Sequence, residues 1–186
     1  QRLRERVPAE ILVQAGLAAS RGDETRPGRG GIYDRFRNRL MVPLIAPGGA
    51  VLGFGARAMG DEQPKYLNSP ETGVYHKGRF LFALEQARRT VKADGEMIVV
   101  EGYFDAIALH QAGIRNTVAT SGTALTADHA HALKRLVRGV ALTYDSDAAG
   151  QQAMLRSLGV LLAEGLDVVV VDLPAGDDPD SLVRRA

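Results

Sequence analysis

The segment 144–150 reads Tyr-Asp-Ser-Asp-Ala-Ala-Gly and places two carboxylates, Asp145 and Asp147, one residue apart. The apolar run 139–143 precedes it and a helical pattern follows, so both acids are expected at the carboxyl end of a strand. Ligands bind at this edge of an open α/β sheet. Two acids this close, without a basic neighbour in sequence, repel each other unless a cation or a proton relieves the repulsion. The spacing therefore indicates a divalent metal site.

Other predicted strands also end in acidic or polar residues. Glu101 and Asp105 follow the first strand, and Asp178 and Asp180 follow the fourth, while the second ends in the polar loop 120–123. If the strands are parallel, all of these residues lie at one edge of the sheet. Oxygen ligands without His or Cys favour Mg²⁺ or Mn²⁺ over zinc. Such a site suits phosphoryl transfer, in which bound metals neutralise phosphate oxygens.

Each acid also has a structural interpretation. Asp178, Pro179 and Asp180 make a good helix start, with Asp as the N-cap, Pro at the first helical position and an acid in the first turn. Asp145 is an alternative N-cap for a helix that begins near residue 148. Glu101 could pair with an arginine and Asp105 could orient a loop. The coincidence of acids on three strand ends favours the metal site.

The elements that must position these acids alternate regularly along the second half of the chain. Strands are predicted at 97–100, 116–120, 140–143 and 167–171, and helices at 104–112, 126–137, 148–164 and 178–185. Thr126 is the expected N-cap of its helix. A repeated strand–helix order predicts a parallel sheet with helices on its faces. The fourth strand is almost entirely Val, which is typical of a strand buried on both faces. His129 and His131 are expected on an exposed helix face.

The first half of the chain is less regular and more basic. The sequence predicts a short helix at 8–15, a polar Gly/Arg-rich loop at 20–31, a β-hairpin from 40–46 and 50–58, a polar loop at 60–78 and a helix at 80–93. Asp94-Gly95 marks the expected boundary between a basic α+β subdomain, 1–95, and a metal-binding α/β domain, 96–186. Lys and Arg exceed Asp and Glu in the first part, and the reverse holds in the second. This asymmetry suggests a polyanion on one side and metal ions on the other.

Composition limits the possible classes of protein. The 186 residues are 45% hydrophobic and 24% charged, as in a globular protein. The absence of cysteine excludes disulfides and thiolate zinc sites within these residues. No apolar run is long enough for a membrane helix and no signal peptide opens the chain, so a cytosolic location is expected. The abrupt opening residues suggest an excised fragment.

Three of the acidic segments resemble the Toprim domain: the run Glu101-Gly-Tyr-Phe-Asp105, the segment 144–150 and the run Asp178-Pro-Asp180. Bacterial primases, topoisomerases, some nucleases and some repair proteins share that domain. Four segments of the first half resemble the catalytic core of bacterial DnaG-type primases: 32–39, 53–57, 64–72 and 76–78. The resemblance covers nearly the whole chain in the family's order. One departure is Ser146, where primases commonly have Gly between the two aspartates.

This resemblance implies roles for individual residues. The implied catalytic metal ligands are Glu101, Asp145 and Asp147, with Asp105, Asp178 and Asp180 in or beside the same cluster. The implied contacts to nucleic acid or to the nucleotide triphosphate are Arg57, Lys65 and Lys77. Tyr66 and Asn68 lie between these basic positions, and contact with sugar or base is as plausible for them as a packed loop position. The basic run 35–39, with Phe36 inside it, is also expected to contact nucleic acid.

The resemblance implies the catalytic core of a DNA primase, a nucleotidyltransferase that makes short RNA primers on single-stranded DNA from ribonucleoside triphosphates. The implied cofactor is Mg²⁺ or Mn²⁺, and no zinc is expected in this fragment. For the full-length protein it implies the replicative helicase and the single-strand-binding protein as partners at the bacterial replisome, through regions absent here. Two alternatives stay open: another Toprim enzyme, such as a topoisomerase or nuclease, and a non-catalytic DNA-binding module of the same fold.

Overall fold

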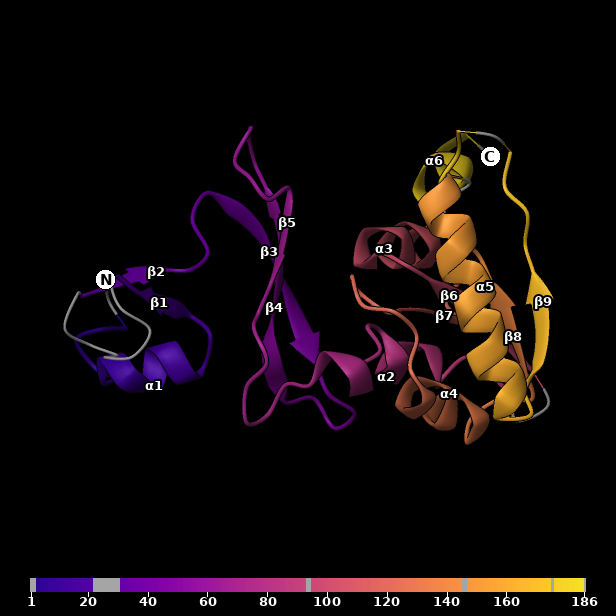
Figure 1. The fold of residues 1–186 in the computed structure, drawn as a ribbon, viewed down its shortest axis with the longest axis horizontal. Coiled ribbons are helices and arrows are strands. Elements are labelled where there is room, and N and C mark those ends of the chain that lie inside the picture. The colour runs from indigo at the N-terminus through magenta and orange to yellow at the C-terminus, as the bar shows by residue number, and fades with distance from the viewer. Residues whose placement is uncertain (1–2, 22–30, 93–94, 145–146, 175, 186) are drawn as a thin grey trace. The chain divides into compact units, whose positions relative to one another are not determined.

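The computed structural model describes residues 3–21, 31–92, 95–144, 147–174 and 176–185. The chain forms two compact units, residues 1–76 and 77–186, whose elements can be followed in Figure 1. The compact units therefore do not divide at the predicted boundary, residue 95. The assignment of separate roles to 1–95 and 96–186 stays a prediction.

The first unit opens with helix α1 (Ala9–Gln14) and a two-stranded antiparallel sheet of β1 (Ala18–Ser20) and β2 (Ile32–Asp34). The predicted helix at 8–15 is confirmed. It ends before Gly16, whose φ of 68° is the left-handed conformation that suits the residue after a helix. A Cβ at Gly16 would lie only 2.5 Å from Pro70 Cδ, so the position has room for glycine alone. Residues 22–30 of the predicted loop lie outside the described residues.

A three-stranded antiparallel sheet forms the rest of this unit: β3 (Arg39–Ile45), β4 (Val51–Ala58) and β5 (Tyr66–Asn68), in the order β3–β4–β5. The predicted hairpin is confirmed. Its turn contains Gly48 and Gly49, both with positive φ. Strand β5 was not predicted, because three residues between Pro64 and Pro70 are too few to show an alternating pattern.

The second unit is built on a parallel sheet, as predicted. Its strands are β6 (Glu96–Val100), β7 (Thr117–Ala119), β8 (Gly139–Leu142) and β9 (Asp167–Val170). They are hydrogen-bonded in the order β7–β6–β8–β9, and every pair is parallel. The carboxyl ends of the strands therefore meet at one edge, where the acidic residues were expected.

Helices cover both faces of this sheet, and the alternation along β6 shows how. Met97 and Val99 belong to a core that includes residues of α4 (Ala127–Lys134) and α5 (Ala148–Ala163). Val100, on the opposite face, packs with α3 (Tyr103–Gln111), against which α6 (Pro179–Arg185) also lies. The result is a three-layer arrangement whose helices match the predicted positions.

The predicted helix over 80–93 is wrong in extent. The structure has a short 3₁₀ turn, η1 (Lys77–Arg79), and a four-residue helix, α2 (Leu84–Ala87). Between them Phe82 is extended, because its N–H and C=O both bond to Ala119 at the end of β7. This tertiary pairing prevails over the helical pattern. Residues 93 and 94 lie outside the described residues.

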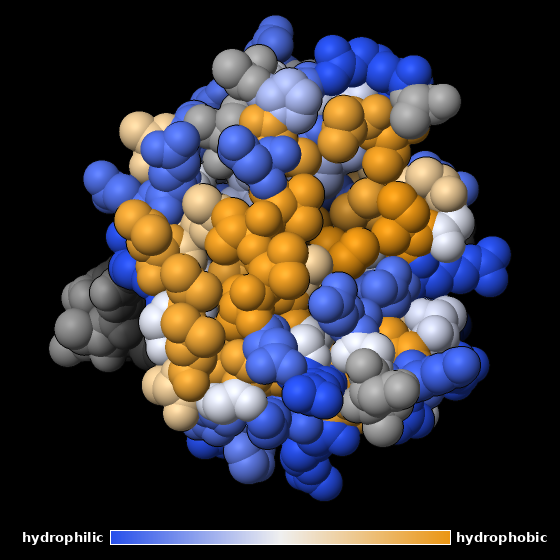
Figure 2. Space-filling model, turned by 90° about the vertical axis from the view of Figure 1, so that its right-hand side faces the viewer, coloured by the Kyte–Doolittle hydropathy of each residue, from blue (hydrophilic) through white to orange (hydrophobic). Residues whose placement is uncertain are grey.

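The expectation that the Val-rich strand is buried on both faces is also wrong. Among the described residues β9 pairs with β8 alone and forms one edge of the sheet, so its side chains are only partly covered. Val169 is 51% exposed and Val170 is 40% exposed. On α5, Leu155 and Leu162 are exposed as well. Figure 2 looks onto this side of the molecule and shows apolar residues gathered on it.

His129 is a third correction, because it is fully buried rather than on the surface. Its Nδ1 accepts the N–H of Thr126 at 3.2 Å, and its Nε2 lies 3.0 Å from the carbonyl oxygen of Lys77. Thr126 is the N-cap of α4, as predicted, and its hydroxyl accepts the N–H of His129. His129 therefore closes a capping box and also attaches α4 to η1. His131 is exposed, as expected.

Among the described residues, no helix has the length and apolar character that a membrane-spanning helix requires.

Candidate functional site

Glu101 occupies the centre of the sheet's carboxyl edge. It directly follows β6, which lies between β7 and β8. The backbone on both sides is fixed to this strand, because Ser121 N–H donates to the Glu101 carbonyl (2.9 Å) and Thr143 N–H donates to the Val99 carbonyl (3.0 Å). The side chain of Glu101 is therefore flanked by the loop that follows β7 and by the end of β8. This placement agrees with the prediction.

Asp105 lies close to the turn between β6 and α3. Gly102 is the N-cap of α3, and a Cβ on Gly102 would lie 2.6 Å from Asp105 Oδ2. The carboxylate of Asp105 is thus folded back over the backbone that directly follows Glu101. Any side chain at residue 102 would occupy this space, so the approach of the Asp105 carboxylate depends on the glycine that follows Glu101.

Asp147 begins α5. Its Oδ1 accepts the N–H of Gly150 at 2.7 Å, so Asp147 is the N-cap of this helix. The alternative that Asp145 is this cap is wrong. Asp145 and Ser146 themselves lie outside the described residues. The carboxylate of Asp147 has capacity beyond the single bond of the cap, because each of its oxygens can accept more than one partner.

Asp178 and Asp180 show the structural roles that the sequence left open. Asp178 Oδ1 accepts the N–H of Ser181 (2.6 Å), and the Asp178 N–H donates to Ser181 Oγ (3.0 Å), so this pair caps α6. Asp180 forms an ion pair with Arg184 at 2.5 Å. A further role of these two acids beside a metal stays a prediction.

No group of three or more His, Cys, Asp or Glu side chains in the described part of the chain is close enough to hold a metal ion. The described residues thus place Glu101, Asp105 and Asp147 at strand ends and helix starts but do not assemble a complete set of ligands. The adjacent Asp145 belongs to the part that is not described.

Tyr144 connects the end of β8 to α5. Its side chain is buried, and its hydroxyl lies 2.9 Å from Ser157 Oγ. Burial, the largest cause, raises the pKa of Tyr144 to about 12, and the negative charge of Glu101 acts in the same direction. Tyr144 is therefore a neutral phenol at physiological pH, and it fixes the position of α5 relative to the end of β8.

A cavity of about 260 Å³ opens beside Glu101. The loop after β7, Tyr144 and three residues of α5 line it, among them Arg156. Arg156 had no predicted role, since nothing in its sequence neighbourhood indicates that it lines a cavity.

The predicted nucleic-acid contacts of the first unit lie partly on one face of its larger sheet. In the antiparallel register Arg57 is opposite Tyr66, and Asn68 is opposite Gly55. Side chains directly opposite each other share a face, as do those two residues apart, so Arg57, Tyr66 and Asn68 are on the same face. Lys65 Nζ lies 5.5 Å from the centre of the Tyr66 ring. Two cations around an exposed aromatic ring suit phosphate contact and base stacking.

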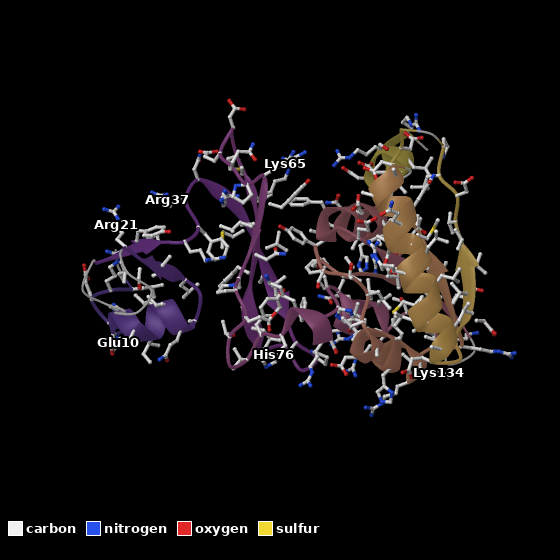
Figure 3. All side chains as sticks on the ribbon, viewed as in Figure 1. Glu10, Arg21, Arg37, Lys65, His76 and Lys134 are labelled. Atoms are coloured by element: carbon white, nitrogen blue, oxygen red, sulfur yellow. The ribbon has the colours of Figure 1, made fainter. Side chains whose placement is uncertain are left out.

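The basic run 35–39 lines a second cavity in the first unit, of about 420 Å³. Arg35, Arg37 and Arg39 alternate along the chain and all line it, together with Tyr33. The guanidinium of Arg37 lies 5.4 Å from the centre of the Tyr33 ring, and that of Arg21 lies 5.8 Å from it; both arginines are labelled in Figure 3. The alternation was present in the sequence, but Tyr33 was not singled out as part of it.

Lys77 belongs to the second unit, where it begins η1. Its carbonyl accepts from the buried His129, so the backbone from which its side chain extends is tied to α4. The structure thus brings Arg57, Lys65, Tyr66 and Asn68 together in one unit and places Lys77 in the other.

Two family models match this chain. The model described as the N-terminal domain of the DNA primase catalytic core matches residues 2–88, and one described as Toprim-like matches residues 98–183. A DNA primase of Clostridium acetobutylicum is 45% identical over 174 residues, which are 94% of this chain and 28% of that protein.

Solved structures agree with these matches. The crystal structure of a DNA primase domain from Pseudomonas aeruginosa superposes with a TM-score of 0.86 at 45% identity, covering 95% of this chain and 54% of the other. A DnaG primase catalytic domain bound to single-stranded DNA gives a TM-score of 0.85 at 41% identity, covering 97% and 58%. The chain thus spans just over half of these catalytic domains and less than a third of the curated relative's length.

Proposed function

Since the chain belongs to the DnaG-type DNA primase family, we propose that it carries part of the site that synthesises RNA primers on a single-stranded DNA template. The observation that supports this most directly is the position of Glu101. Glu101 directly follows β6, an inner strand of the parallel sheet. The Asp105 carboxylate is folded over the residue after Glu101, and Asp147 begins α5. The chain spans just over half of the solved primase domains that it matches, so primer synthesis by the whole protein is part of this proposal.

The donor set fits Mg²⁺ or Mn²⁺ rather than zinc, because the candidate ligands are carboxylate oxygens and the chain has no cysteine. Glu101, Asp105 and Asp147, together with Asp145, would hold the metal, and Asp178 and Asp180 would lie beside it. A bound divalent ion supplies positive charge that stabilises phosphate oxygens during phosphoryl transfer.

The residues of the chain itself bind and orient the substrates in this proposal. Arg57 and Lys65 neutralise phosphates, while Tyr66 offers a ring for stacking and Asn68 offers an amide for hydrogen bonds to sugar or base. The arginines of the run 35–39 in the first unit, and Lys77 in the second, supply further cations for phosphate contact. Contacts of this kind weaken steeply as the salt concentration rises.

The proposed reaction is nucleotidyl transfer. The 3′-hydroxyl of the growing primer attacks the α-phosphorus of the incoming ribonucleoside triphosphate, the hydroxyl proton passes to water, and pyrophosphate leaves. The template strand, the primer and the triphosphates are the proposed partners. Association with the replicative helicase and the single-strand-binding protein, in the bacterial cytoplasm at the replication fork, is part of the same proposal for the full-length protein.

Calorimetric titration of ribonucleoside triphosphate into this chain, with Mn²⁺, with Mg²⁺ and without metal, tests the proposal. Glu101→Gln and Asp147→Asn remove one charge each with little change in shape, and Asn is as good an N-cap as Asp. Asp167→Asn is the matched control, because Asp167 lies at the amino end of β9 in an exposed ion pair with Arg138.

We expect binding that requires metal and that is lost in the first two variants but kept in the control. Binding that is unaffected by metal, or equal in all four proteins, would refute the assignment of the nucleotide to this edge of the sheet.

A further inference from the structure

The cavity beside Glu101 is bounded by three separate parts of the second unit. Its polar lining residues are Glu101, Thr120, Thr123, Tyr144, Arg156 and Ser157. Thr120 follows β7, Tyr144 follows β8, and the last two belong to α5. Because β6 lies between β7 and β8, the cavity is situated directly beside the strand end that carries Glu101.

The walls of this cavity are held in place. Thr120 N–H donates to the Val100 carbonyl (3.2 Å), and the loop then curls through Ser121 and Gly122, which both have positive φ. On the opposite wall, Ser157 is hydrogen-bonded to the buried Tyr144. Arg156 is the neighbour of Ser157 on the same helix, so this bond also fixes the backbone from which the guanidinium extends.

Among the described residues that line the cavity, Arg156 is the one with a cationic side chain. Its side chain is exposed, and within the described part of the chain no carboxylate forms an ion pair with it. An arginine without a carboxylate partner has five N–H donors to offer, in a planar arrangement that matches phosphate oxygens. The hydroxyls of Thr120 and Thr123 add smaller donors on the opposite wall.

We propose that this cavity is a polyphosphate subsite, in which Arg156 holds the terminal phosphates of a nucleoside triphosphate and the pyrophosphate that leaves. This inference rests on the proposed function, because it assigns the triphosphate end of that substrate to a place next to Glu101. It distinguishes Arg156 from the predicted cations Arg57 and Lys65, which belong to the other unit. The subsite binds phosphate groups and does not discriminate between bases.

Titration of inorganic pyrophosphate in the presence of Mg²⁺ tests the subsite without the nucleoside. Arg156→Gln removes the charge at an exposed position, and Arg156→Lys keeps the charge without the planar donors. The matched control is Arg135→Gln, since Arg135 is an exposed arginine at the end of α4, and it does not line the cavity.

We expect Arg156→Gln to weaken pyrophosphate and nucleoside triphosphate about tenfold or more, as for a hydrogen bond to a charged group, and to leave nucleoside monophosphate unchanged. Arg156→Lys should have affinities between those of the parent and Arg156→Gln, and Arg135→Gln should have the affinities of the parent. Pyrophosphate binding that is equal in the parent and Arg156→Gln would overturn the subsite.

The two proposals fail separately. Triphosphate binding that still depends on metal and Glu101 but not on Arg156 would refute the subsite and leave the proposed function intact. Pyrophosphate binding that depends on Arg156, in a chain that binds no triphosphate with any metal, would support the pyrophosphate part of the subsite, overturn its triphosphate part and count against the proposed function.

Discussion

The buried ring of His129 makes two hydrogen bonds, and replacement of His129 by Gln is expected to keep one and to remove the other. Its Nδ1 closes the capping box of α4, and its Nε2–H donates to the carbonyl of Lys77. Gln at the third helical position is a usual partner for a Thr N-cap, so the variant keeps an acceptor for the N–H of Thr126. It loses the ring that reaches Lys77. His129→Gln therefore tests the attachment of η1 to α4 while the helix cap is preserved.

The magnitude follows from what each partner retains. The Lys77 carbonyl keeps a second donor, the N–H of Phe80 at 3.3 Å, so it is not left wholly unpaired. The loss is then close to the net value of one buried hydrogen bond, about 1 kcal/mol, plus the packing of a ring that is fully buried. We expect the free energy of unfolding of the second unit to fall by about 1–2 kcal/mol.

The pH dependence of stability provides a second readout. Burial, the largest cause, lowers the pKa of His129, while its bond to Lys77 acts in the opposite direction. Because the folded-state pKa lies below the unfolded value of about 6.5, the unfolded chain binds the extra proton first. The stability from neutral His129 is complete above that value and is lost as the pH falls toward the folded-state pKa. The slope due to one such group reaches about 1.4 kcal/mol per pH unit.

Urea unfolding followed by circular dichroism, at intervals from pH 7.5 down to 5.5, checks both parts, with hydrogen exchange of the α4 amides as a local probe. His131→Gln is the control, because His131 is exposed on the same helix. The parent and the control should lose stability below about pH 6.5 more steeply than His129→Gln. If all three share one pH profile, or if His129→Gln is as stable as the control at pH 7.5, the inferred neutral and buried state of His129 is incorrect.

Three further substitutions have definite expected outcomes. Gly102→Ala should weaken metal-dependent triphosphate binding in calorimetry. The new Cβ would lie only 2.6 Å from Asp105 Oδ2, so the Asp105 carboxylate would have to move. Unchanged affinity would argue against Asp105 as a ligand. Asp147→Ala should cost about 1 kcal/mol in urea unfolding and Asp147→Asn much less, since only Ala abolishes the cap of α5. Gly16→Ala should destabilise the first unit by roughly 1–3 kcal/mol, because a positive φ and the contact with Pro70 both oppose a side chain; a neutral result would contradict this geometry.

Much of the second unit could be predicted because local patterns and tertiary contacts agree there. Thr126 stands before a helical pattern and is its cap, and each apolar run from 97 onward became a parallel strand. The first unit was harder, since β5 has only three residues. The shortened α2 follows from the pairing of Phe82 with Ala119, which lies 37 residues further along the chain. No local pattern can show such a contact.

The sequence predicted the positions of some candidate site residues along the fold, and their roles stay predictions. Spacing alone placed Glu101 at the end of a strand, and the structure agrees. That Asp147 rather than Asp145 caps α5 depends on backbone angles that the sequence does not contain. Burial was misjudged at His129 because it depends on the contact of its ring with Lys77, which lies 52 residues earlier in the chain. Arg156 lines a cavity only because three separated segments meet around it.

The exposed apolar residues of β9 and α5, which include Val169 and Leu155, can make the stability of the folded chain depend on protein concentration. Exposed valines on this edge strand and exposed leucines on α5 form a surface on which we expect two chains to associate, since no strand among the described residues pairs with the outer edge of β9. Association of native chains stabilises the folded form, because the unfolded chain does not present this surface. The melting temperature of the isolated chain should then rise with protein concentration, and a charged residue in place of Val169 should abolish that rise.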